Sequence, residues 1–197
     1  GAAAVAGTLL AAAKRGAEVN VVGVMPLAEN MPSQDAIRPG DVLTTMSGKT
    51  IEIMSTDAEG RLLLADAVHY AQEEFQPQLL VNIATLTGSA ARAMGNDYAA
   101  IITRELDLSL EMMEVGKTAG EDVWPLPLHP SHFEQIESLI ADIKNTGGHP
   151  GASIGAAVVG TFVDEELPWV HLDIAGVDWR DSATPTAPEG HAGWGVR

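Results

Sequence analysis

Apolar residues fall in short runs that alternate with amphipathic segments along most of the chain. Runs rich in valine, isoleucine and leucine, at residues 78–88 and 169–179, have the length and composition of buried strands. Residues 61–74 form an amphipathic segment of the kind that packs one helical face on a sheet. Because strands and helices alternate, the pattern predicts an α/β fold of three layers, with a central mixed, largely parallel sheet flanked by helices.

The remaining segments fit the same interpretation. The pattern predicts further helices at residues 2–14, residues 106–120 and the end of the glycine-rich stretch 147–167. It predicts a buried strand within residues 17–30, a hairpin over residues 41–55 and a strand at residues 98–103. Loops are expected at residues 30–41 and residues 180–197, and the three prolines of stretch 122–130 exclude a helix there.

The composition indicates one acidic domain. Of the 197 residues, 46% are apolar, which is enough for a sizeable core. The chain has 27 acidic and 11 basic residues, and its formal net charge of −16 repels nucleic acid phosphates and anionic membrane surfaces. The charge therefore argues against nucleic acid and membrane partners, and it favours cations such as metal ions or the free amine of a ligand.

The absence of cysteine restricts the metal chemistry. Any metal must be bound by carboxylates, imidazoles, carbonyls or water, and a chain without cysteine suits a cytoplasmic location. No apolar run reaches the roughly 20 residues that a membrane-spanning helix needs. The sequence starts within a predicted helix and without methionine, so we expect it to be a piece of a longer protein.

Two carboxylates and a guanidinium lie at the junction between the hairpin and the next helix: Asp57, Glu59 and Arg61. If this segment is extended, Asp57 and Glu59 point to one side, about 6.5–7 Å apart along the chain. That separation suits one divalent metal ion or a pair of them, and Arg61 at the helix start can face an anion beside the metal. Thr56 is a candidate cap for the helix.

A simpler interpretation of the junction stays open. Acidic residues often precede a helix because they complement its dipole, and Arg61 can pair with a neighbouring carboxylate. An EF-hand is a poor match, because the alternating Asp and Asn residues and the late Glu of such a loop are missing.

The junction belongs to a longer resemblance. The segment TDAEGRLLLADA is similar to the signature of the leucyl aminopeptidase family, the cytosolic two-metal aminopeptidases. The segments NIATLTGSA, GGHPGASIGAA, WVHLDIAG and GHAGWGVR resemble later parts of that family in the same order. The resemblance covers nearly all of residues 1–197 and implies a metal-dependent hydrolase that removes N-terminal residues, Leu-like ones preferred, from peptides.

The resemblance also implies roles for individual residues. Asp57 and Glu59 would bind two divalent ions, Zn or Mn, with Glu59 bridging them. Arg61 would be the catalytic residue that holds a bicarbonate ion, which acts as the general base. The substrate would be bound by the remaining matched positions, which are Thr85, Leu86, Gly88 and Ala175.

Two positions depart from the family pattern. Ser55 stands where the family usually has Asn, and Asp178, near the first side-chain pocket, stands where an apolar residue is expected. The family's other metal ligands and its catalytic Lys precede the signature and lie outside this sequence. The resemblance therefore implies that residues 1–197 are a catalytic domain truncated at both ends, inactive alone, whose parent protein is a hexamer.

Two other functions remain open. One is a non-catalytic assembly or binding module derived from the family, and the other is a two-metal hydrolase of a different amide. The six histidines offer no clear ligand set: HPSH is expected in a loop, His69 on the helix as a surface or packing residue, and His171 as a core histidine. The stretch GGHPGASIG resembles a phosphate-binding loop, but tight turns before a closely packed helix are the simpler interpretation.

Overall fold

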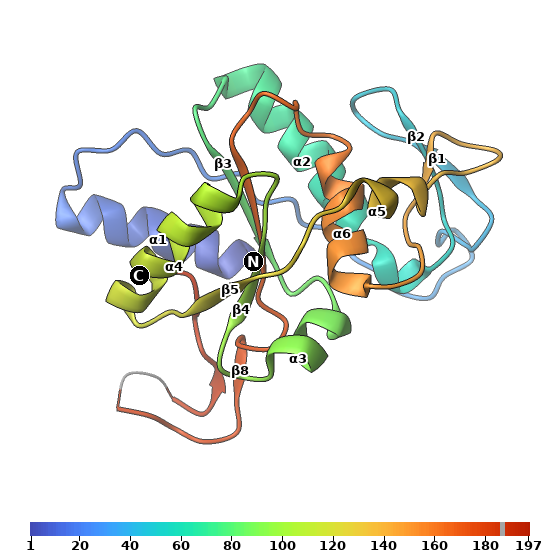
Figure 1. Cartoon of the computed structure of the whole chain (residues 1–197). Helices are drawn as coiled ribbons and strands as arrows, with labels where there is room; N and C mark the ends of the chain where they lie inside the picture. The colour runs from blue at the N-terminus through green and yellow to red at the C-terminus, as the bar shows by residue number, and fades with distance from the viewer. Residues whose placement is uncertain (186–187) are drawn as a thin grey trace.

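A mixed four-stranded sheet forms the centre of the molecule, and the computed structural model describes residues 1–185 and 188–197 (Figure 1). The strands, in spatial order, are β3 (Leu80–Ala84), β7 (Trp169–Asp173), β4 (Ala99–Ile102) and β5 (Val123–Pro125). The pairs β3–β7 and β4–β5 are parallel, and β7 pairs with β4 antiparallel. The sheet is therefore mixed and largely parallel, as the sequence predicts.

Helices cover both faces of the sheet (Figure 1). One layer contains α2 (Gly60–Phe75), α3 (Gly88–Met94) and α6 (Gly151–Gly160), and the other contains α1 (Ala2–Arg15) and α4 (Leu106–Ala119). All five residues of β7 are buried, because Trp169 packs in the core under α6 while Val170 and Leu172 pack in the core under α4. The three-layer α/β prediction is confirmed.

Smaller elements surround this core. A second sheet joins β1 (Val42–Thr44), β2 (Thr50–Glu52) and β6 (Ile143–Lys144), and the remaining helices are η1 (Thr56–Ala58) and α5 (Pro130–Glu134). The predicted hairpin is β1 and β2. The C-terminal stretch is not entirely loop, because β8 (Trp179–Arg180) pairs with β9 (Gly190–His191); residues 186 and 187 of this stretch lie outside the described residues.

The buried strand predicted within residues 17–30 is wrong. This stretch contains no regular secondary structure, and three of its four valines are exposed, with Val19 61% and Val22 53% accessible. It lies over α1, since a side chain at Gly23 would touch Leu9 and Val5. A β-branched run forms a strand only where another strand pairs with it, and no strand does so among the described residues.

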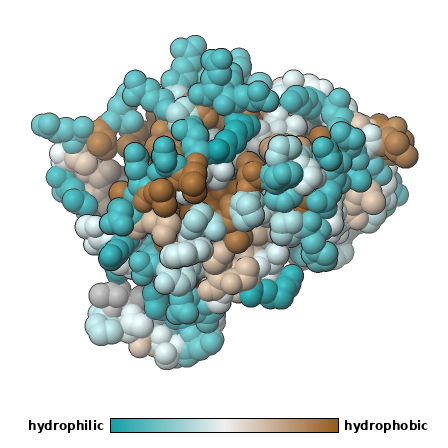
Figure 2. Space-filling model, viewed as in Figure 1, coloured by the Kyte–Doolittle hydropathy of each residue, from teal (hydrophilic) through white to brown (hydrophobic). Residues whose placement is uncertain are grey.

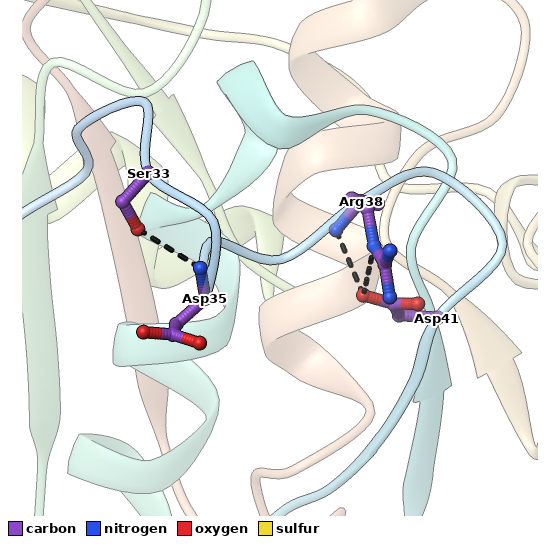
Figure 3. Close-up of polar contacts among 4 residues, drawn as sticks. All are labelled: Ser33, Asp35, Arg38 and Asp41. Atoms are coloured by element: carbon purple, nitrogen blue, oxygen red, sulfur yellow. Dashed lines mark hydrogen bonds and ion pairs between the residues drawn. The ribbon is translucent and has the colours of Figure 1, made fainter.

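The predicted loop at residues 30–41 is confirmed and is held by local polar contacts (Figure 3). The amide of Asp35 donates to Ser33 Oγ at 3.2 Å, and the amide of Arg38 donates to Asp41 Oδ2 at 2.9 Å. Arg38 Nε also lies 3.8 Å from the same carboxylate oxygen. These contacts set the direction in which the chain enters β1.

Hydrophilic residues cover much of the face seen in Figure 2, and apolar residues gather mainly across its middle. Within residues 1–185 and 188–197, no helix combines the length and the apolar character needed to cross a membrane.

Candidate functional site

The junction that carries the two carboxylates is helical rather than extended. Ser55 is still extended, with φ −142° and ψ 128°, but η1 follows at once and Glu59 already has α-helical angles. The expectation that Asp57 and Glu59 share one side of an extended segment is therefore wrong. Asp57 is exposed and Glu59 is half-buried at the start of α2.

The two carboxylates are not used to hold the fold. Among the described residues, neither Asp57 nor Glu59 has a side-chain hydrogen bond or an ion-pair partner. The simpler interpretation, that Arg61 pairs with a nearby acid, fails as well, because no carboxylate oxygen of the described residues lies within 4.0 Å of it. Thr56 does not cap α2, since it lies inside η1 and the helix has no side-chain cap.

Arg61 is buried and only partly satisfied. Its side chain is 7% exposed, Nη1 donates to the carbonyl oxygen of Asn145 at 2.6 Å, and Nε has no partner. Burial lowers the pKa of Arg61, and the nearby carboxylate of Asp173 opposes this shift. A guanidinium stays charged in proteins, so Arg61 is a buried cation with donor capacity to spare.

The loop after β3 is organised by one buried carboxylate that the sequence analysis did not single out. Asp173 Oδ1 accepts from the amides of Leu86, Thr87 and Ala175 at 3.0, 3.3 and 3.3 Å. Its Oδ2 accepts from Thr87 Oγ1 at 2.7 Å. Burial raises the pKa of Asp173, and these hydrogen bonds oppose the rise. Two of the predicted substrate-binding residues, Leu86 and Ala175, thus meet at the same carboxylate.

An open cavity of about 1120 Å³ is lined by residues from both the start of α2 and the loop after β3. Its lining includes Glu59, Gly60, Thr85 and Leu86, together with part of α1. A side chain at Gly60 would lie 3.4 Å from Leu86 Cδ1, which shows how closely the start of α2 approaches the loop after β3. Glu59, Thr85 and Leu86 therefore line the same cavity, and the start of α2 at Gly60 approaches Leu86.

Four predicted residues do not line the cavity. They are Asp57, Arg61, Gly88 and Ala175. Gly88 begins α3, directly after Thr87, whose hydroxyl caps that helix by accepting from the amide of Ala90. Ala175 follows β7 and is placed by its hydrogen bond to Asp173.

Helix α6 packs close to the loop after β3 and to Arg61. A side chain at Gly155 would lie 3.0 Å from Thr87 Cγ2, 3.3 Å from Leu86 Cδ2 and 3.4 Å from Arg61 Nη2. Nine of its ten residues are buried, so close packing of small residues is the interpretation that the structure supports for the glycine-rich stretch. No phosphate-binding loop is needed to explain it.

The two departures from the family pattern have structural partners. The backbone of Ser55 is bonded to the side chain of Asn145, as described below. The carboxylate of Asp178 lies 3.9 Å from His191 Nδ1.

His129 and His132 are structural residues of α5. The expectation of a loop at HPSH is wrong, because Pro130 is the first residue of α5 and His129 Nδ1 accepts from the amide of Ser131. Proline is tolerated at this first position, where no helical hydrogen bond is lost. Within the part of the chain that the structure describes, no three His, Asp or Glu side chains converge as a metal site.

His171 is a core histidine, as predicted, and it makes folding sensitive to acid. It is fully buried in β7, and its Nδ1 lies 2.7 Å from Asn82 Nδ2. Burial, with a smaller contribution from the charge of Arg61, lowers the pKa of His171 to about 3. Below about pH 6.5 the unfolded chain binds a proton that the folded chain does not, so folding stability falls as pH falls toward 3.

We expect His171→Gln to remove this acid sensitivity. Between pH 7.5 and pH 5 the wild type should lose about 2 kcal/mol more of its unfolding free energy than the variant, measured by urea denaturation at both pH values. The raised pKa of Asp173 acts in the opposite direction but is common to both proteins and cancels in the difference. An equal loss in both would show that His171 does not titrate as the structure implies.

Comparisons with known proteins agree with one another. Residues 1–197 match the family model described as "Cytosol aminopeptidase family, catalytic domain". A protein of Caulobacter vibrioides named "Probable cytosol aminopeptidase" is 52% identical over 198 residues, which covers 100% of this chain and 40% of that protein. The chain therefore spans about 40% of the length of its curated relatives.

Solved structures show the same likeness. The bottromycin maturation enzyme BotP is 37% identical with a TM-score of 0.92, covering 100% of this chain and 44% of BotP, and it has also been solved in complex with Mn. A mutant of tomato leucine aminopeptidase is 41% identical with a TM-score of 0.78, covering 84% of this chain and 32% of the tomato chain.

Proposed function

The chain belongs to the cytosol aminopeptidase family, and on that premise we propose that the complete protein containing it removes N-terminal residues from peptides by metal-dependent hydrolysis. The observation that carries the proposal is one cavity lined by Glu59, Thr85 and Leu86, with α6 packed at Gly155 close to both Leu86 and Arg61. This arrangement supports the proposal because segments that are distant in the sequence supply these residues.

Asp57 and Glu59 are the proposed metal ligands. Both carboxylates are free of other partners in the described structure, and hard divalent ions such as Mn²⁺, as well as Zn²⁺, accept carboxylate oxygen ligands. Two carboxylates are only part of a ligand set, so the donors fit a site that residues outside this chain would complete. The Mn-bound form of BotP supports this choice of metal.

Two divalent ions, when bound, would polarise the scissile carbonyl, activate a water and attract the free amine of the substrate. Arg61 would hold a bicarbonate ion as the general base, because its buried guanidinium has a free Nε and no ion-pair partner among the described residues. A bidentate contact with such an anion would consist of two charge-assisted hydrogen bonds in a site largely shielded from water.

The loop after β3 is the proposed binding surface for the substrate. The carbonyl of Leu86 would accept a hydrogen bond from the peptide backbone, with Thr85 and Gly88 beside it. Ala175 would contact the first side chain, and a small residue there leaves room for a Leu-like group. The amide hydrogen bonds of Asp173 hold Leu86 and Ala175 in place without using their carbonyls.

The wider context is part of the same proposal. Residues 1–197 would form a portion of the catalytic domain, and the fragment alone would be inactive because other ligands are needed. The complete protein would act in the cytoplasm as a homo-oligomer, a hexamer in the family to which it belongs. A preference for Leu-like residues also rests on that family.

Metal removal tests the proposal. The complete protein, stripped with a chelator, should lose at least about 100-fold of its activity on a chromogenic leucine amide and regain it with Mn²⁺ or Zn²⁺. The same substrate with an acetylated amine should not be cleaved, since its amine cannot reach a metal. Absence of turnover with every metal would favour the non-catalytic binding module, and cleavage of the acetylated amide would favour a different amide hydrolase.

A further inference from the structure

Asn145 connects its side chain to both sides of the carboxylate turn. It is fully buried, and its Oδ1 accepts from the amides of Met54 and Ser55 at 2.8 and 3.3 Å. Its Nδ2 donates to the carbonyls of Ser55 and Ala58 at 2.7 and 3.4 Å. Every hydrogen-bonding atom of this amide is therefore directed at the segment that carries Asp57 and leads into Glu59.

The backbone of Asn145 contacts both β2 and Arg61. The amide of Asn145 donates to the carbonyl of Glu52 at 3.0 Å, which extends the pairing of β2 with β6. Its carbonyl oxygen accepts from Arg61 Nη1 at 2.6 Å. Among the described residues this carbonyl is the one hydrogen-bond partner of the Arg61 side chain, so Asn145 contacts both the turn and the guanidinium.

The junction has little local support of its own. Neither η1 nor α2 has a side-chain cap at its start, although the amides there need partners. A short 3₁₀ turn with poor hydrogen-bond geometry keeps one shape only if its surroundings fix it. The amide of Asn145 supplies that fixation from a segment about 90 residues away.

We propose that Asn145 is the positioning residue of the metal site: its side chain fixes the turn that aims Asp57 and Glu59, and its carbonyl fixes the direction of Arg61. The proposal rests on the proposed function of those three residues. Groups that orient metal ligands affect metal affinity strongly, typically by 10–100-fold. An asparagine is needed because the turn presents two amides and two carbonyls to the same side chain, which only a side-chain amide can satisfy together.

The test compares Asn145→Ala and Asn145→Asp with Gln72→Ala in the complete protein. Gln72 is a matched control, since its side-chain amide also joins distant backbone, donating to the carbonyl of Phe162 and accepting from the amide of Asp164, yet it does not line the cavity or contact the junction. Both Asn145 variants should bind Mn²⁺ about 10–100-fold more weakly than wild type in a direct titration. At saturating Mn²⁺, their kcat on a leucine amide should fall about 100-fold while KM changes little. Gln72→Ala should lose thermal stability, with metal affinity and kcat nearly unchanged.

A measurement on the wild type keeps the proposal testable if the Asn145 variants do not fold. In the wild type, hydrogen exchange at the amides of Met54 and Ser55 should be as slow as in β2, because Asn145 Oδ1 accepts from both. Rapid exchange there, or folded Asn145 variants with wild-type Mn²⁺ affinity and kcat, would overturn the proposal. A wild type without metal-dependent activity would overturn the proposed function, and the role of Asn145 with it.

Discussion

Replacing Glu59 with alanine in the complete protein is expected to lower kcat/KM on a leucine amide by at least about 10³-fold and to remove bound metal. Glu59 is half-buried at the wall of the cavity, and its carboxylate has no partner among the described residues. Its removal therefore breaks no contact that holds the fold, so the thermal unfolding temperature of the metal-free protein should change little. Metal content by mass spectrometry and steady-state kinetics measure both effects.

Glu74 provides the control for this variant. It is an exposed glutamate near the end of the same helix, so Glu74→Ala changes the net charge equally without touching the cavity. Glu74→Ala should retain wild-type kinetics and metal content. A Glu59→Ala protein that still hydrolyses the amide at the wild-type rate would remove Glu59 from the metal site.

Asp173→Ala is expected to have the largest effect on stability, with a fall in unfolding free energy of about 3 kcal/mol. The substitution leaves three amides and the hydroxyl of Thr87 without their acceptor in a buried place. The loop that carries Leu86 should lose its fixed shape, which raises KM for peptides in protein that remains folded. Urea denaturation and steady-state kinetics test the two consequences.

Asp173→Asn removes the charge of the side chain but keeps its shape. Asparagine keeps an oxygen where the three amides converge, and its amide can donate to Thr87 Oγ1 in place of accepting from it. This variant should recover most of the stability that Asp173→Ala loses. If alanine at this position were as stable as aspartate, the hydrogen bonds at the end of β7 would not be the support of the loop.

Much of the fold follows from local pattern. The strands β3, β4 and β7 are short apolar runs, and Gly16 and Gly120 end α1 and α4 in left-handed conformations that glycine adopts easily. Residues 17–30 have the composition of a strand but no pairing partner in the described structure, which periodicity alone does not reveal. In HPSH, Pro130 argues against a helix by composition, but proline is favourable at a helix start.

The candidate site, like the fold, is only partly predictable from local sequence pattern. Asp57, Glu59 and Arg61 are close in the sequence and form a recognisable motif, but the 3₁₀ turn between them is set by a residue far along the chain. Asp173 and Asn145 were missed because each acts mainly on residues at least 84 positions away, and neither belongs to a local motif with chemistry of its own. Buried polar residues at the ends of strands are the signal that would have pointed to them.

The location of bound metal tests the central claim most directly. Crystals of the complete protein grown with Mn²⁺ should show anomalous scattering peaks about 2.0–2.3 Å from carboxylate oxygens of Asp57 and Glu59, close to Leu86 and Arg61. Mn²⁺ bound elsewhere, with the Asp57 and Glu59 carboxylates directed into solvent in an active enzyme, would contradict the account.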